Sequence, residues 1–354
     1  MEQEKLLFRV PALLLEWYDR EARVLPWREN TDPYRVWVSE IMLQQTRVEA
    51  VMPYYERFLS AFPTLADLAA APEEQLLKLW EGLGYYSRAR NLQKAAREAL
   101  ERFGGLPGTV KELSSLPGIG AYTAGAVASI AFSQPVPAVD GNVLRVFARL
   151  TDNHGDVLSP SVRRESEKTV SAIIPKDRPG DFNQAVMDLG ATVCLPGGAP
   201  HCAVCPAASL CRSHMHGTEK ELPVRAKKQP RRIEAYTALL LVDPDGRIAL
   251  CKRPESGLLG GLWALPNAPG ARGPQEALAL AQAFGATPLD LTASAEYTHV
   301  FTHVEWHITC YRIACAAPEG KSACIWADAA ARAAHYALPT AFAKALEHLH
   351  LEQR

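Results

Sequence analysis

The stretch 116–132, LPGIGAYTAGAVASIAF, decides the fold of the first half of this 354-residue chain. Gly118 and Gly120 stand in a turn directly before a run of small and apolar residues that begins near Tyr122. Glycine lets the backbone approach a ligand closely, and the amides at the start of a helix attract an anion. The pattern favours a helix-hairpin-helix over about 113–132 that contacts phosphates and not bases. An ordinary tight turn between two helices explains these residues equally well.

Helical patterns extend on both sides of this turn, through residues 1–216. Asp32 followed by Pro33 is typical of a helix N-terminus, because aspartate caps the free amides and proline suits the first helical position. Apolar spacing predicts further helices, with short connections that carry proline and glycine. The predicted ranges are 11–20, 33–55, 64–70, 73–79, 87–103, 110–114, 122–132, 143–150, 161–174 and 182–193. The sequence therefore predicts an all-α domain over 1–216.

The pattern changes after a polar segment, 217–232, which carries six basic and two acidic residues and two prolines. We interpret this segment as a basic linker. Strands are expected at 236–242, 247–253 and within 295–314, and helices at 275–284 and 340–349. Residues 233–354 thus form a small α+β domain.

The composition of the chain limits the classes of function that it can have. The net charge is −1, so neither domain is strongly basic, and any contact with nucleic acid must use local patches. The longest apolar run, 121–132, is too short to cross a bilayer. The first residues are charged and resemble neither a signal peptide nor an organelle import signal. We expect a monomer without membrane contact in the cytoplasm, associated with the nucleoid if the source is bacterial.

Four cysteines gather within a short stretch, at Cys194, Cys202, Cys205 and Cys211. A tight cluster of this kind in a chain without a secretion signal indicates metal binding, not disulfides. The single compact loop with unequal gaps favours a 4Fe–4S cluster over 194–211, and zinc remains the alternative. The other four cysteines, Cys251, Cys310, Cys315 and Cys324, are expected to be buried apolar residues.

Together these features resemble the endonuclease III superfamily, and most closely its adenine DNA glycosylases of the MutY type. The resemblance rests on the segments 25–46, 81–92, 116–132, 138–150 and 182–194, and on RPESGLLGGLWALP (253–266) and HVFTHVEWHIT (299–309) in the second half. It implies a helix-hairpin-helix glycosylase domain with an iron–sulfur loop, followed by a Nudix-like domain. The implied activity is removal of adenine mispaired with 8-oxoguanine, and also with guanine, from double-stranded DNA.

The resemblance assigns two carboxylates to the chemistry. Glu40 becomes the general acid that protonates adenine N7, a role for which a partly apolar site must keep it protonated. Asp140, which we expect to cap a helix beginning near Gly141, stabilises the sugar cation or adds to it covalently. Asn142 and Tyr122 order the site. Bifunctional relatives carry a lysine where Tyr122 stands, so we expect little or no strand cleavage.

The resemblance also assigns the contacts to DNA. The adenine pocket uses Trp27, Arg28 and Asp188, the last of which is glutamate in several relatives. Other residues implied to contact the DNA or the opposite base are Leu43, Gln45, Thr46, Leu83, Tyr85, Gly118 and Gly120. In the Nudix-like domain, Phe301, Thr302 and His303 match a Phe-Ser-His loop that senses 8-oxoguanine, with threonine in place of serine.

The sequence departs from the family pattern in further places. The first cysteine gap has seven residues where six are usual, and its loop carries only His201 as a basic residue. Ala264 stands where relatives often have glutamate. The helix PQEALALAQAFG has Glu276 alone where an active Nudix enzyme needs several glutamates, which excludes pyrophosphohydrolysis.

Two other functions remain open. An endonuclease III-like lyase would act on oxidised pyrimidines, and an iron–sulfur sensor on an inactive scaffold would bind DNA without turnover. Tyr122 and the C-terminal domain argue against the lyase, while the presence of both Glu40 and Asp140 argues against the sensor.

Overall fold

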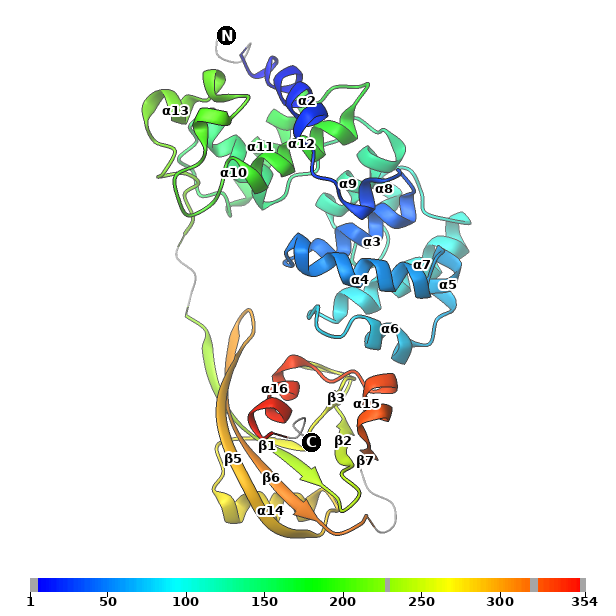
Figure 1. The fold of residues 1–354 in the computed structure, drawn as a ribbon. Helices are drawn as coiled ribbons and strands as arrows, with labels where there is room; N and C mark the ends of the chain where they lie inside the picture. The colour runs from blue at the N-terminus through cyan, green and yellow to red at the C-terminus, as the bar shows by residue number, and fades with distance from the viewer. Residues whose placement is uncertain (1–5, 227–229, 319–323, 351–354) are drawn as a thin grey trace. The chain divides into compact units, whose positions relative to one another are not determined.

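The computed structural model describes residues 6–226, 230–318 and 324–350. The chain divides into two compact units (Figure 1). Unit 1 comprises residues 1–70 and 90–227, and unit 2 comprises residues 71–89 and 228–354. Residues 71–89, which the sequence places in the helical domain, thus group with the second half of the chain.

The described residues of unit 1 form helices and connecting loops, without a strand. Its helices are α2 (Val10–Glu21), α3 (Pro33–Leu43), α4 (Val48–Ala61), α5 (Leu65–Ala70), α7 (Ser87–Phe103), α8 (Val110–Leu113), α9 (Ala121–Phe132), α10 (Gly141–Thr151), α11 (Pro160–Ile173), α12 (Pro179–Thr192) and α13 (Arg212–His216), with 3₁₀ turns η1 (Pro26–Arg28), η2 (Cys202–Val204) and η3 (Ala208–Leu210). Each predicted helix is confirmed. The predicted range 33–55 is divided into α3 and α4 by a break at Gln44–Arg47.

Capping residues fix several of these helix starts. Asp32 accepts a hydrogen bond from the amide of Arg35 and begins α3, as the sequence predicts. Asp140 caps α10 in the same way. In the middle of α9, a Cβ at Gly125 would collide with the carbonyl oxygen of Pro137. The small residues of α9 therefore allow the strand-like segment before Asp140 to lie directly against that helix.

Unit 2 is built on a mixed sheet of β1 (Arg232–Val242), β2 (Ile248–Lys252), β3 (Trp263–Ala264), β4 (Asn267–Pro269), β5 (Pro288–Val300), β6 (Val304–Cys315) and β7 (Ile325–Ala327). The main strand order is β3-β2-β1-β6-β5, and β4 pairs with β1 while β7 pairs with β2. The β1–β6 pair is parallel and every other pair is antiparallel. The helices of this unit are α6 (Glu73–Leu79), α14 (Pro274–Ala283), α15 (Ala329–His335) and α16 (Thr340–His348).

Alternation along β1 builds two cores, one on each face of the sheet. Ala238 and Leu240 pack toward α16, and Leu239 and Leu241 pack toward α14. The result is a layered α/β arrangement with α14 and α16 on opposite faces (Figure 1). The sequence predicted β1, β2, α14 and α16, whereas the two- and three-residue strands and α15 are too short to leave a periodic pattern.

Two sequence expectations need correction. Cys310 and Cys315 are buried thiols as predicted, but Cys251 and Cys324 form a disulfide between β2 and the start of β7. Sequence spacing does not reveal this pair, because strand pairing and not chain proximity brings them together. Part of the predicted linker is also held in place by contacts with the rest of the chain. Between 217 and 226 it has no helix or strand, yet Leu222 is buried and the carbonyl of Val224 accepts from the amide of Val157.

No helix among the described residues is long and apolar enough to span a membrane.

Candidate active site

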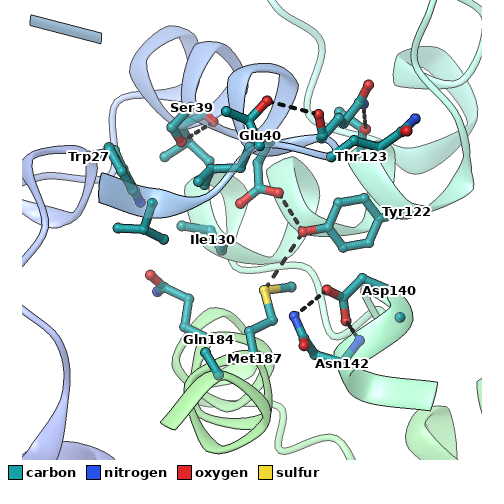
Figure 2. A pocket seen from close by; sticks show the side chains of 18 of the residues that line it. Trp27, Ser39, Glu40, Tyr122, Thr123, Ile130, Asp140, Asn142, Gln184 and Met187 are labelled. Atoms are coloured by element: carbon teal, nitrogen blue, oxygen red, sulfur yellow. Dashed lines mark hydrogen bonds between the residues drawn. The ribbon is translucent and has the colours of Figure 1, made fainter. Parts of the chain in front are cut away.

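A pocket of about 990 Å³ opens in unit 1 between α3, α9, α10 and α12 (Figure 2). Predicted site residues that line it are Trp27, Arg28, Glu40, Leu43, Gln45, Thr46, Gly118, Gly120, Tyr122, Asp140 and Asn142. These residues come from segments more than a hundred positions apart, so the fold brings the predicted catalytic and base-contacting groups into one cavity.

Glu40 lies in the pocket on the buried side of α3. Its side chain is 7% exposed, and its Oε2 accepts a hydrogen bond of 2.6 Å from the hydroxyl of Tyr122. Burial raises the pKa of Glu40 to about 7, although the hydrogen bond from Tyr122 works in the opposite direction. Burial, together with the charge of Glu40, also raises the pKa of Tyr122 well above its usual value. Tyr122 is therefore a neutral donor, and Glu40 holds a proton at a pH where most carboxyls have lost theirs.

Asp140 faces the same pocket from the start of α10 (Figure 2). Its Oδ1 accepts from the amides of Asn142 and Val143 at 2.8 and 2.7 Å, and its Oδ2 accepts from Asn142 Nδ2 at 2.9 Å. Burial raises the pKa of Asp140, and these three hydrogen bonds, which favour the carboxylate, only partly offset that rise. Asn142 thus fixes the orientation of the Asp140 carboxylate.

Arg145 in turn fixes the orientation of Asn142. Arg145 Nη2 donates to Asn142 Oδ1 at 2.8 Å, and Arg145 Nε donates to the carbonyl of Cys194 at 2.8 Å. A continuous chain of hydrogen bonds therefore connects Asp140 to the first of the four clustered cysteines.

Asp188, which the family resemblance assigns to the adenine pocket, does not line that pocket in the structure. It is fully buried, and both of its oxygens accept from arginines. Arg28 donates to Oδ2 at 2.7 Å and to Oδ1 at 2.9 Å, and Arg23 donates to Oδ1 at 2.6 Å. Burial acts to raise the pKa of Asp188, but the two arginines outweigh it and hold that pKa below its usual value. In this structure Asp188 orients Arg28 and is not free to bind a base.

Sequence reasoning missed several pocket residues, among them Arg23, Gln184 and Met187. Arg23 shares Asp188 with Arg28, and Met187 Sδ lies 3.8 Å from the hydroxyl of Tyr122. Gln184 lines the pocket from α12, near Met187 and on the side of the pocket toward Trp27 (Figure 2). Gln184 stands one helical turn before Asp188, and this spacing on α12 is the signal that could have found it.

Gly118 and Gln45 show unusual backbone at the mouth of the pocket. Gly118 has φ +74°, and a Cβ there would lie 2.7 Å from Cβ of Asn91, so this hairpin position requires glycine. Gly120 has extended backbone, φ −86°, and N-caps α9. Gln45 is a non-glycine residue at φ 60°, a strained conformation that often marks a functional position.

The four cysteines Cys194, Cys202, Cys205 and Cys211 line one small cavity in unit 1. Arg149 Nη1 donates to Cys194 Sγ at 3.2 Å. A single zinc ion would draw its thiolates to within about 4 Å of one another, since each Zn–S bond is about 2.3 Å. Over the described residues, no three of these cysteines have their sulfurs within 4.8 Å of one another. Among the described residues, the group of possible ligand atoms within 4.8 Å of one another is Cys202, His214 and Glu219. Four thiols around one cavity are the donor set that an iron–sulfur cluster takes.

A further set of predicted residues lies in unit 2. The hydroxyl of Tyr85 and Thr302 Oγ1 are 2.9 Å apart, and both residues are exposed. Tyr85 has φ 48°, and Phe301 packs against Trp306 with ring centroids 4.8 Å apart. Thr302 and His303 form the exposed turn between β5 and β6. Leu83, which the sequence assigned to a DNA contact, is 7% exposed and is not displayed on the surface.

Glu276 is a helix cap. Its Oε2 accepts from the amide of Gly273 at 3.0 Å, which closes the start of α14. The lone glutamate of this helix therefore has a structural role as its N-terminal cap.

The helical fold and the glycine hairpin are those of a base excision DNA repair protein. Residues 38–172 match the HhH-GPD superfamily of base excision DNA repair proteins, and residues 237–348 match the NUDIX domain. A solved structure described as a non-covalent endonuclease III–DNA complex has a TM-score of 0.52 at 28% identity. It covers 61% of this chain and 99% of that chain. A thermostable thymine-DNA glycosylase structure gives a TM-score of 0.53 at 27% identity, over 60% of this chain and 98% of that chain.

Curated relatives narrow the class to one family. The adenine DNA glycosylase of Rattus norvegicus is 40% identical over 360 residues, which cover 85% of this chain and 69% of the relative. That of Buchnera aphidicola subsp. Baizongia pistaciae (strain Bp) is 37% identical over 258 residues, 72% of each chain. The chain belongs to the adenine DNA glycosylase family, whose members are hydrolases acting on N-glycosyl bonds.

Proposed function

We propose that this protein removes adenine from DNA where adenine stands opposite 8-oxoguanine, and also opposite guanine. The observation that carries the proposal is that the buried Glu40 and the half-buried Asp140 face one pocket, and that each has a raised pKa. Two carboxylates in different hydrogen-bonding environments are suited to breaking a glycosidic bond, one as an acid and one as an anion.

Glu40 acts as the general acid in this proposal. With a pKa of about 7 it carries a proton at neutral pH and can donate that proton to N7 of adenine, which improves the leaving group. Tyr122 holds Oε2 through its hydroxyl, so the other carboxyl oxygen is the one free to donate.

Asp140 acts on the sugar. As the base departs, positive charge develops on the sugar ring, and an oriented carboxylate stabilises it or adds to it for a time. The two bonds from Asn142 keep the carboxylate in place. Water then completes the hydrolysis. Tyr122 offers no amine for a Schiff base, so the enzyme is monofunctional.

The adenine must leave the base stack to reach this pocket. Trp27 supplies an apolar wall, and Arg28, held by Asp188, supplies donors to the acceptor nitrogens of the purine. Gln184 supplies an amide with both a donor and an acceptor, the pair that matches the amino group and ring nitrogen of adenine. Gln184 thereby takes the part that the sequence assigned to Asp188.

The opposite base is read by polar and aromatic residues. Tyr85, Thr302 and His303 lie on one exposed surface of unit 2, and the Tyr85–Thr302 hydrogen bond gives that surface a fixed pair of hydroxyls. Gln45 and Thr46, at the mouth of the unit 1 pocket, fill the gap that the extruded adenine leaves. Gly118 and Gly120 bind DNA phosphates through the hairpin backbone.

The cofactor in this proposal is one 4Fe–4S cluster held by Cys194, Cys202, Cys205 and Cys211, and its contribution is structural. Cys202→Ser should lower the iron content, the melting temperature and the DNA affinity. The cluster assignment would be refuted if neither the unmodified protein nor Cys202→Ser contained iron and Cys202→Ser were folded and fully active. We further propose that the protein acts as a cytoplasmic monomer.

The test is a single-turnover assay on a duplex with one 8-oxoguanine·adenine pair, beside a thymine-glycol duplex. The product is divided and treated with or without hot alkali. Cleavage at the adenine that depends on alkali supports the proposal. Cleavage at thymine glycol without alkali would replace it with an endonuclease III-like lyase, and DNA binding without turnover would favour the inactive sensor.

A further inference from the structure

Two charged side chains, Lys78 of α6 and Glu81 in the turn that follows it, connect residues 71–89 to the second half of the chain within unit 2. Neither residue lines the catalytic pocket, and the family resemblance gives neither a role. We propose that Lys78 and Glu81 position Tyr85 against Thr302 and thereby set the preference for 8-oxoguanine over guanine opposite adenine. The effect on this preference rests on the proposed function, whereas the positioning of Tyr85 does not.

The ammonium of Lys78 has an acceptor for each of its three protons. Its Nζ donates to the carboxylate of Glu81, to the carbonyl of Arg332 at 2.9 Å and to the carbonyl of Tyr336 at 3.3 Å. Arg332 lies in the last turn of α15 and Tyr336 directly follows that helix, where the carbonyls carry negative partial charge and attract a cation. Lys78 therefore closes the C-terminal end of α15 from another helix.

Glu81 completes this contact. Its Oε2 accepts from Lys78, and its Oε1 accepts from the amide of Leu338 at 2.6 Å. The side chains of Lys78 and Glu81 are only 19% and 28% exposed, and Leu338 is buried. Opening the contact would leave two partly buried charges without partners, so residues 78–81 are anchored to the segment 332–338.

Hydrogen bonds brace the turn that leads from this anchor to Tyr85. The amide of Leu83 donates to the carbonyl of Trp80, and Trp80 Nε1 donates to the carbonyl of Gly84 at 3.1 Å. Arg88 Nη2 donates to the carbonyls of Leu83 and Gly84. The guanidinium carbon of Arg88 lies over the ring of Tyr85, 5.5 Å from the ring centre. Tyr85 therefore keeps a fixed position relative to the anchored end of α6.

The hydrogen bond between Tyr85 and Thr302 needs this support. Both residues are exposed, and the bond between their hydroxyls competes with water on both sides. The contact of Lys78 and Glu81 is more deeply buried and combines an ion pair with three hydrogen bonds to the backbone. It therefore decides where Tyr85 stands relative to Thr302.

The first measurement is hydrogen exchange of the turn in the whole chain, which does not depend on activity. In Glu81→Ala, the amides of Leu83 and Arg88, which form hydrogen bonds within the turn, should exchange at least about threefold faster than in the unmodified protein. The melting temperature verifies that the variant is folded.

Glu98→Ala is the matched control, because it removes a glutamate whose ion pair with Arg102 lies within one helix, α7. It should leave the exchange of the turn unchanged. Unchanged exchange in Glu81→Ala, or an equal increase in Glu81→Ala and Glu98→Ala, would overturn the proposal.

The second measurement is the ratio of single-turnover excision rates for adenine opposite 8-oxoguanine and adenine opposite guanine. Glu81→Ala should lower this ratio by at least about threefold, and Glu98→Ala should not change it. Glu81→Gln keeps an oxygen that accepts from the amide of Leu338, and it should retain the ratio to within about twofold. A loss in Glu81→Gln as large as that in Glu81→Ala would overturn the positioning role of this bond.

A double variant shows whether the contact acts through Thr302. In a Thr302→Val background, Glu81→Ala should lower the ratio by less than about twofold, because the bond that it supports is already absent. Effects that combine in full, or an unchanged ratio in Glu81→Ala alone, would overturn the role in specificity. If the unmodified protein removes adenine from neither duplex, the proposed function fails, and hydrogen exchange still decides whether Glu81 positions Tyr85.

Discussion

The hydroxyl of Tyr122 donates to Glu40 Oε2 at 2.6 Å, across the pocket between α9 and α3 (Figure 2). The same tyrosine position that excludes Schiff-base chemistry thus orients the proposed acid. The bond also lowers the pKa of Glu40 against the larger effect of burial, so Tyr122 keeps that pKa near neutrality.

The first prediction concerns the pH dependence of the single-turnover rate. Glu40 must be protonated, so the rate should fall as the pH rises through about 7. Asp140 must be ionised, so the rate should also fall in acid, at a pH above the ordinary pKa of aspartate. In Tyr122→Phe the loss of the hydrogen bond should move the alkaline limb to higher pH. An alkaline limb that Glu40→Gln retains would show that another group titrates.

The second prediction concerns stability. The pKa of Glu40 is raised from 4.5 to about 7 on folding, so the folded state binds the proton more tightly. The stabilisation that this provides is complete below pH 4.5 and is lost as the pH rises to about 7. Above that pH, Glu40→Gln should be more stable than the unmodified protein by up to roughly 3 kcal/mol. Chemical denaturation at acid and alkaline pH measures the difference, and a pH-independent difference would contradict the burial argument.

The third prediction tests the two arginines that share the buried carboxylate of Asp188. Asp188→Asn leaves Arg28 and Arg23 without their shared carboxylate and should cost about 3 kcal/mol of unfolding free energy. It should also lower kcat/KM for adenine removal, because Arg28 is no longer oriented. Asp181→Asn, which removes an exposed ion pair with Arg178, is the matched control and should cost less than about 1 kcal/mol. Equal destabilisation of the two variants would refute the assigned role.

The fourth prediction tests the exposed surface of unit 2. Thr302→Val keeps the shape of the side chain but removes the hydroxyl that pairs with Tyr85. The preference for 8-oxoguanine over guanine opposite adenine should fall by up to about tenfold. Thr302→Ser retains the hydroxyl and should retain the preference. Rates on paired duplexes that differ only in the opposite base give this ratio, and an unchanged ratio in Thr302→Val would exclude a role in lesion recognition.

Local signals in the sequence predict most of the helical unit. Aspartate caps, prolines at first helical positions and 3.6-residue spacing act within a few residues, so α3, α10 and α11 could be placed before the structure was known. Short strands such as β3 depend on tertiary pairing and leave no such signal. The Cys251–Cys324 disulfide escaped prediction because it depends on the pairing of β2 with β7.

The two catalytic carboxylates could be predicted from the sequence, whereas the residues that line the pocket walls were harder to predict. Glu40 and Asp140 stand in recognisable motifs, and the cap at Asp140 follows from residue type. Asp188 was assigned to the base because a motif does not show which direction a side chain takes within a helix. Two arginines, one of them outside any motif considered, compete for its oxygens.

In the proposed reaction, Asp140 stabilises the sugar as adenine departs. Asp140→Asn is the most direct test, because asparagine also caps helices and should leave α10 and DNA binding intact. In a single-turnover assay on an 8-oxoguanine·adenine duplex, we expect adenine excision to fall by at least about a hundredfold with unchanged affinity for the duplex. An excision rate equal to that of the unmodified protein would show that Asp140 does not stabilise the sugar.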